Sequence, residues 1–157
     1  MDFDWGEIGK VLAYLVPAII LILVNVVFKK QQEQKRRQSV VRSLISEIDY
    51  NQKLIEALSI QWQAKKFKTG NWKRNKDKMD YIDPSLHSTL TGAYEITEDF
   101  NREIDAAKKY KSASYLASIQ TDRLKEPLAQ SKQGLEEWLE ANTSKKEPLP
   151  RHHGSSS

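Results

Sequence analysis

The chain contains no cysteine, and its 157 residues include only three histidines, six glycines and five prolines. The absence of cysteine excludes disulfide bonds, thiolate metal sites and cysteine nucleophiles together. No Gly-rich phosphate loop, His-Glu-x-x-His motif or calcium-binding loop is present. No segment alternates polar and apolar residues long enough to predict a strand, and no repeat of roughly 20 to 50 residues is visible. These absences favour an all-α fold and argue against an enzyme.

Charged residues are missing from one stretch, Val11 to Phe28. As a helix rising about 1.5 Å per residue, it would extend over roughly 27 Å, close to the hydrocarbon thickness of a bilayer. A buried core helix and a cleaved signal peptide are the alternatives, but the preceding residues are acidic and no A-x-A cleavage site follows. The segment 11–28 is therefore predicted as a transmembrane helix, preceded by a short extracytoplasmic N-terminus, 1–10.

Basic residues are concentrated directly after this run. Residues 29–42 contain one acid, Glu33, and six basic residues: Lys29, Lys30, Lys35, Arg36, Arg37 and Arg42. Positive residues beside a membrane span are retained in the cytoplasm, which predicts a cell-membrane protein with its N-terminus outside and its C-terminal part inside. All but Arg42 belong to a basic juxtamembrane stalk, 29–39, which is also a candidate binding surface for anionic lipid headgroups. A topology signal without lipid binding is the alternative.

Two residues are unusual inside the predicted span. Pro17 removes one intrahelical hydrogen bond and can kink the helix, and Asn25 places an amide near the inner boundary of the membrane. An amide at this depth can hydrogen-bond a neighbouring helix, which would support a homo-oligomer. Alternatively, Asn25 lies close enough to the end of the run to reach headgroup water.

An apolar stripe follows the stalk and predicts the first of three cytoplasmic helices. Its members step alternately by three and four residues, as a and d positions of a heptad do: Val41, Leu44, Ile48, Asn51, Ile55, Leu58 and Trp62. Ile45 and Leu54 widen the stripe, which favours a bundle over a two-stranded seam. Asn51 is interpreted as a polar layer within the monomer, or alternatively as a residue that fixes partner number. The helix is expected to end near Lys68.

Two more helices are predicted after a loop over 69–82. Asp83 as N-cap and Pro84 at the first helical position mark the start of the second helix. Its apolar face comprises Leu86, Leu90, Ala93, Phe100, Ile104 and Ala107. A break at 111–114 precedes the third pattern, Leu116 to Leu139, which Pro127 is expected to kink or divide.

These patterns predict an all-α chain in which residues 40–142 form a coiled-coil-like three-helix bundle. Short connections place neighbouring helices antiparallel, so an up-down-up arrangement standing on the stalk is expected. Residues 143–157, with His152 and His153, are expected to form a disordered tail.

A second basic cluster covers residues 65–78, where seven Lys and Arg residues are interleaved with Phe67 and Trp72. Basic and aromatic side chains together can clamp phosphates and stack bases, but solvated loops are also rich in lysine. The candidate partner contacts are Trp72, Lys73, Arg74, Lys76 and Lys78. A solvated loop without a partner is favoured over either role, and among partners a protein is favoured over nucleic acid.

Catalytic chemistry has little support in the sequence. His87 lies among Ser85, Ser88 and Thr89, but no nucleophile-elbow motif accompanies it. Glu95, Asp99 and Glu103 are spaced by four residues and are interpreted as a charged helix face, because the histidines of a bundled di-metal site are missing. No catalytic residue, metal or cofactor is predicted.

The sequence therefore favours a non-enzymatic, single-pass membrane-anchored interaction module, such as a scaffold, regulator or accessory subunit. Its expected partners are an anionic bilayer surface and either another protein or further copies of the chain. The alternative is a membrane-active oligomer of the toxin, holin or ion-conducting type. A single span without a polar face argues against a conducting pore.

Overall fold

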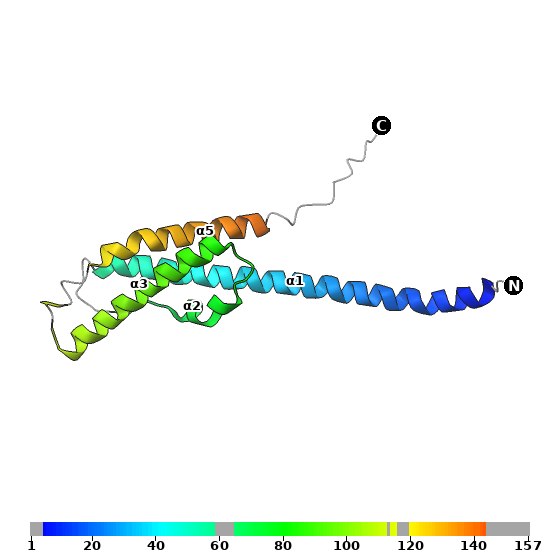
Figure 1. Cartoon of the computed structure of the whole chain (residues 1–157), viewed down its shortest axis with the longest axis horizontal. Coiled ribbons are helices and arrows are strands. Elements are labelled where there is room, and N and C mark those ends of the chain that lie inside the picture. Colours follow the sequence, from blue (N-terminus) through cyan, green and yellow to red (C-terminus); the bar gives the residue numbers. More distant parts are fainter. Residues whose placement is uncertain (1–4, 59–64, 113, 116–119, 144–157) are drawn as a thin grey trace, which may run out of the picture. The chain divides into compact units, whose positions relative to one another are not determined.

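The computed structural model describes residues 5–58, 65–112, 114–115 and 120–143, with side chains of the first range described from Leu15 to Ala57. All regular structure in these ranges is helical, and no strand occurs among them, so the predicted all-α class is confirmed. The main elements are α1 (Trp5–Leu58), α2 (Gly70–Asn75), α3 (Pro84–Lys109), α5 (Lys125–Thr143) and the short 3-10 helices η1 (Lys76–Lys78) and η2 (Thr121–Leu124) (Figure 1). The chain divides into unit 1, Met1–Ser39, and unit 2, Val40–Ser157.

The described part of unit 1 is the N-terminal portion of α1. Every described side chain from Leu15 to Phe28 is exposed, and the large hydrophobic ones are 44% to 69% exposed. Among the described helices, α1 alone is long and apolar enough to span a membrane, although a signal sequence near the N-terminus would meet the same criterion. Pro17 lies inside the helix and does not end it.

Unit 2 contains a hydrophobic core. The unit 2 part of α1 contributes five hydrophobic residues that are at most 7% exposed: Val41, Leu44, Ile48, Leu54 and Ile55. Ile45 packs against them, partly buried. The burial of these residues confirms the predicted stripe, while the side chains of Leu58 and Trp62 lie outside the described residues.

The helix α3 begins as predicted. Pro84 occupies its first turn, and the Asp83 carboxylate at the N-cap accepts a hydrogen bond from the backbone N–H of Ser85 at 2.8 Å. Hydrogen bonds with Ser85, and a further one with the backbone of Leu86, lower the pKa of Asp83 from its ordinary value. The helix ends at Lys109, after which Lys111 adopts a φ of 49° and the N–H of Ser112 donates to the carbonyl of Ala107. This turn lies at the start of the predicted break.

The segment between α1 and α3 differs from the prediction. The helix α1 ends at Leu58 rather than near Lys68, residues 65–69 are irregular, and the predicted 69–82 loop contains α2 and η1. Asn51 and Asn101 supply hydrogen bonds to the backbone of residues 67–68, as described below, and these bonds hold the two residues in their irregular conformation. The helix α5 starts at Lys125, so that Pro127 falls in its first turn, where no intrahelical N–H bond is required.

Residues 65–78, here called the basic segment, run back along both α1 and α3. The segment is antiparallel to α3, because residues later in the segment contact residues earlier in α3. The three contacts are Lys66 with Asp105, Phe67 with Asn101, and Trp72 with Tyr94. The same holds along α1, where Lys68 contacts Asn51 and Asn71 contacts Glu47 and the Ser43 carbonyl.

The helix α3 therefore runs in the same direction as the unit 2 part of α1 (Figure 1). The expected up-down-up order assumed that a short loop reverses the chain between these two helices, and this part of the prediction is wrong. The basic segment runs opposite to α1 instead, and α3 runs opposite to the basic segment.

Candidate functional site

Two asparagines hold the start of the basic segment from opposite sides. The Asn51 side chain on α1 accepts from the Lys68 N–H at 2.7 Å and donates to the Lys68 carbonyl at 2.8 Å. The Asn101 side chain on α3 does the same for Phe67, at 2.8 Å and 3.0 Å. Each amide thus satisfies both backbone groups of one residue, as a neighbouring strand would. Asn51 is fully buried, which agrees with its interpretation as a polar layer within the monomer.

A buried carboxylate holds the next part of the segment. Glu47 on α1 is 5% exposed and accepts hydrogen bonds from the backbone N–H groups of Asn71, at 2.8 Å, and Trp72, at 3.2 Å. The Tyr94 hydroxyl donates to the same carboxylate at 3.0 Å. Burial, followed by the charge of Glu47 and this hydrogen bond, raises the pKa of Tyr94 far above its ordinary value, so the phenol remains a donor.

The Trp72 indole lies in the core. It is 4% exposed and stacks on the Tyr94 ring, with centroids 5.0 Å apart and planes inclined by 6°. The centroids of the His87 and Trp72 rings are 5.6 Å apart, and His87 Nε2 is 3.1 Å from the Lys76 carbonyl oxygen. A buried ring cannot contact a partner, so the prediction of Trp72 as a partner contact is wrong. The remaining candidate contacts are the four basic side chains.

The four basic candidates, Lys73, Arg74, Lys76 and Lys78, are all exposed. Lys73 pairs with Glu98 at 3.4 Å, and the Arg74 guanidinium donates to the Asn71 side chain and the Gly70 carbonyl. Lys76 and Lys78 have no ion-pair partner among the described residues. The structure thus places the four cations on one short stretch of chain that begins where Glu47 accepts hydrogen bonds from the backbone.

The acidic stripe on α3 is a charged surface. Glu95 and Asp99 are exposed and Glu103 is half-buried, and Asp99 pairs with Arg102 one turn along. No group of three or more acidic or histidine side chains in the described ranges is arranged to hold a metal ion.

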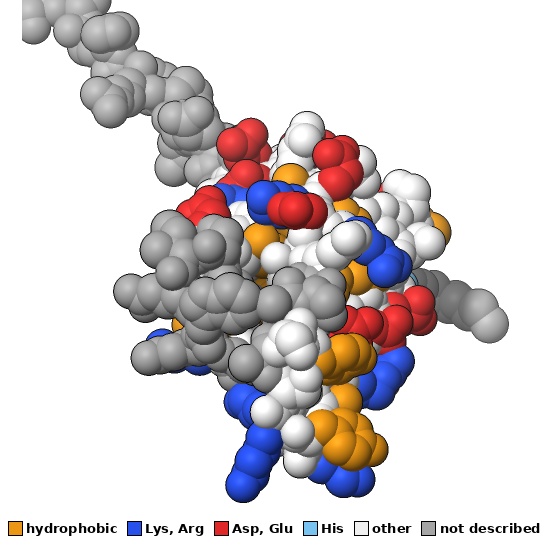
Figure 2. Space-filling view, turned by 90° about the vertical axis from the view of Figure 1, so that its left-hand side faces the viewer, with side chains coloured by type: hydrophobic (Ala, Val, Ile, Leu, Met, Phe, Trp, Pro, Cys, Tyr) orange, Lys and Arg blue, Asp and Glu red, His pale blue; other side chains and the backbone are white. Residues whose placement is uncertain are grey.

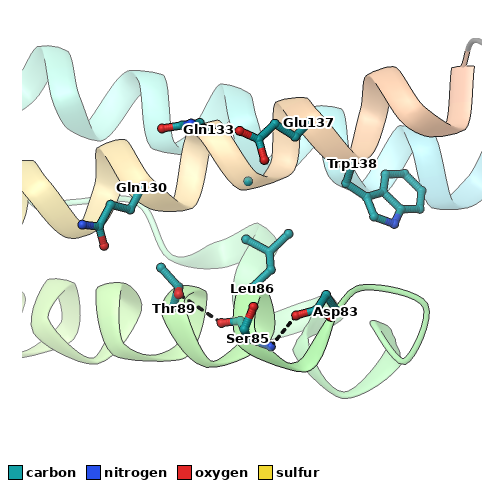
Figure 3. A pocket seen from close by; sticks show the side chains of 9 residues that line it. Asp83, Ser85, Leu86, Thr89, Gln130, Gln133, Glu137 and Trp138 are labelled. Atoms are coloured by element: carbon teal, nitrogen blue, oxygen red, sulfur yellow. Dashed lines mark hydrogen bonds between the residues drawn. The ribbon is translucent and has the colours of Figure 1, made fainter.

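A groove lies between α3 and α5 (Figure 3). It has a volume of about 420 Å³, and the helices approach closely at one edge because α5 carries Gly134, where an added Cβ would lie 2.5 Å from Leu86 Cδ1. Gln130 lies near Thr89, whereas Trp138 lies near Asp83, so α5 runs opposite to α3. Six of the nine residues that line the groove carry polar side chains, and these do not form a charge cluster.

The predicted membrane-surface residues lie on exposed positions of α1 in unit 1. Lys29, Lys30, Lys35 and Arg36 are exposed, and the half-buried Arg37 pairs with Glu33 at 3.2 Å. A shallow hollow on this surface is lined by Lys29, Lys30, Glu33, Gln34 and Arg37. Several cations are therefore within reach of one anionic group.

The described surface of unit 2 is polar. Its exposed large hydrophobic residues are all tyrosines: Tyr50, Tyr110 and Tyr115. Figure 2 shows basic and acidic side chains close together on one face, with hydrophobic side chains visible among them. A partner that recognises the described surface must therefore do so mainly through charge and hydrogen bonds.

Sequence reasoning missed Glu47, Tyr94 and Asn101. Glu47 falls between Leu44 and Ile48 on the apolar stripe, and this position was the signal that it is buried. Asn101 follows the buried Phe100, and its neighbours in sequence do not reveal that its amide faces the basic segment.

No protein-family model matches the chain, and no curated protein or solved structure matches it.

Proposed function

We propose that the chain is a non-enzymatic, single-pass membrane-anchored interaction module that displays unit 2 in the cytoplasm. The observation that carries the proposal is the contrast in burial along α1. Apolar side chains are exposed all round from Leu15 to Phe28, whereas the described large apolar side chains of unit 2, three tyrosines apart, are buried or partly buried in its core. The exposed apolar surface would be covered by lipid, and the polar surface of unit 2 suits water and a protein partner.

The proposed orientation places the N-terminus outside. Its support is the cluster of Lys29, Lys30, Lys35, Arg36 and Arg37 directly after the apolar stretch. The same exposed cations would contact anionic headgroups of the inner leaflet, each contributing on the order of 1 kcal/mol near the surface.

For unit 2 we propose a three-helix bundle in which α1 and α3 are parallel and α5 is antiparallel to both. The Lys132–Asp49 ion pair, at 2.7 Å, joins α5 to α1, and the Tyr94–Glu47 hydrogen bond joins α3 to α1. Lys73, Arg74, Lys76 and Lys78 on the basic segment are the proposed protein-docking residues.

Topology and docking can be tested in the same cells. A reporter that is active only in the cytoplasm should be active when fused after Asn142, and one that needs the cell exterior should be silent. The opposite pattern would contradict the proposed orientation. Affinity purification of the full chain from its native membrane should yield a reproducible protein partner, whereas depolarisation of expressing cells without such a partner would favour a membrane-active oligomer.

A further inference from the structure

The basic segment is held much more firmly than a solvated connection requires. Side chains of Asn51, Asn101 and Glu47 make six hydrogen bonds to its backbone, two each. The Asn71 side chain adds a bond to the Ser43 carbonyl at 3.1 Å. Backbone groups of an exposed loop are normally satisfied by water, so this degree of anchoring fixes a conformation rather than merely closing a gap.

Glu47 provides the least expected of these anchors. Burial of a carboxylate costs free energy that its hydrogen bonds must offset. Replacing a buried charged group by an apolar residue of similar size often leaves the stability of a protein unchanged or raises it. An apolar residue cannot, however, accept hydrogen bonds from the Asn71 and Trp72 N–H groups. These groups begin α2, whose own N-cap residue, Thr69, makes no side-chain capping bond.

The helix α2 depends on this remote cap. It has six residues, which is far below the roughly 12 to 15 at which isolated helices become even marginally stable in water. With Glu47 at its N-terminus and Trp72 stacked in the core, α2 has a fixed position on unit 2. Lys73, Arg74, Lys76 and Lys78 then project from a backbone that is already ordered, so less conformational entropy is lost when a partner binds them.

The chemistry of this surface points to an acidic polypeptide. Residues 70–78 carry four basic residues and one acidic residue, Asp77. On the described surface of unit 2 the exposed large hydrophobic residues are all tyrosines, and the Trp72 indole within the basic segment is buried, so it cannot stack on nucleic-acid bases. The exposed cations complement an anionic partner, and the proposed protein-docking function makes carboxylates of a polypeptide the expected anions.

We infer that the buried Glu47 is a positioning residue that preorganises α2 and η1 as a docking surface for an acidic segment of another protein. The inference rests on the proposed function and adds both the chemistry of the partner and the residue that shapes the site. Glu47 does not touch the partner itself. Its effect on binding passes through the N-terminus of α2.

The test uses the full chain in nanodiscs of zwitterionic lipid and a fluorescent peptide of alternating Glu and Ser. The wild type should bind the peptide with an affinity that falls as salt rises. Lys76→Glu with Lys78→Glu should weaken binding by about tenfold or more, a change of about 1.4 kcal/mol. The matched control is Lys108→Glu with Lys109→Glu, which makes the same charge change at exposed lysines on α3 and should leave affinity within about twofold.

Glu47→Gln tests the positioning role. The Gln side chain keeps the size of Glu but has one oxygen, so it cannot accept from both N–H groups as the carboxylate does, and affinity should fall by about tenfold. Hydrogen exchange at Asn71 and Trp72 should accelerate in the same variant. Adding Thr69→Asp supplies a local cap and restores the net charge, and it should recover both affinity and protection. A role limited to overall stability would not be rescued by a cap on α2.

The outcomes separate the inference from the proposed function. If Glu47→Gln binds the peptide like the wild type while the Lys76 and Lys78 reversal does not, the positioning role is wrong and the docking function stands. Equal losses for both charge reversals would show that binding follows net charge and would overturn the docking surface. Binding of vesicles rich in phosphatidylserine in place of the peptide would overturn the acidic-protein partner in favour of lipid.

Discussion

The two parts of α1 are both helical but differ in the exposure of their apolar side chains. From Leu15 to Phe28 all side chains are exposed, whatever direction they face. From Val41 to Ile55 only one stripe is apolar, and that stripe is buried. The comparison teaches that the helix itself does not determine the environment; the angular distribution of apolar residues does.

The same contrast applies to a single residue type. Asn25 is exposed on the apolar part of α1, whereas Asn51 is fully buried and makes two backbone hydrogen bonds within unit 2. A buried amide is tolerated where the fold provides its partners. For Asn25, the partner must come from water, lipid headgroups or another chain.

The largest expected effect tests whether the two parts of α1 contribute separately to stability. Leu44→Ala removes a fully buried side chain and should lower the free energy of unfolding of unit 2 by roughly 2 to 5 kcal/mol. The same substitution at Leu21, 69% exposed, should leave that free energy unchanged. Denaturation of the full chain in detergent, followed by near-UV circular dichroism, measures both. Equal effects at the two sites would contradict the division of roles.

A smaller effect is expected from the asparagines. Asn51→Ala leaves the Lys68 N–H and carbonyl without their protein partner and should cost about 1 to 3 kcal/mol in the same assay. Asn25→Ala should have no effect on the unfolding of unit 2. A shift from oligomer to monomer in Asn25→Ala, measured by crosslinking in membranes, would show that another copy of the chain supplies the Asn25 partner.

The smallest expected effect concerns the cap at the start of α3 in unit 2. Because hydrogen bonds lower the pKa of Asp83 below 3.8, the charged cap favours the folded state above this pH, and its contribution is lost as the pH falls through the folded-state pKa. Asp83→Asn keeps a capping side chain that does not titrate. Melting curves should show a difference between wild type and variant that is constant near neutral pH and narrows in acid. If the difference in melting temperature stays the same at every pH, titration of Asp83 does not contribute to the pH dependence of stability.

Much of the helical structure was predictable because its signals are local. The spacing of Val41, Leu44 and Ile48 revealed the buried face, and Asp83 with Pro84 marked the start of α3 within the sequence itself. The exposed apolar stretch needed only hydropathy and length. These features depend on residues within a few turns of one another.

The course of the basic segment was not predictable in the same way. The sequence allowed Asn51 as a polar layer but not its bond to Lys68, and nothing near Asn101 indicated that it holds Phe67. The parallel direction of α1 and α3 follows from these nonlocal bonds, so a rule for short loops gave the wrong answer. Trp72 illustrates the same limit, because an aromatic residue among lysines suits either a binding surface or a core.

The hydrogen bonds of Glu47 also have a consequence for the order of folding. They join residues separated by 24, 25 and 47 positions along the chain, so their formation requires the closure of long loops. The helix α2 cannot gain its cap until the unit 2 part of α1 has met it, and Tyr94 must arrive from α3 to complete the cluster. The α2 helix is thus a six-residue element whose N-terminal hydrogen bonds depend on a distant part of the chain, and we expect it to open early when unit 2 begins to unfold.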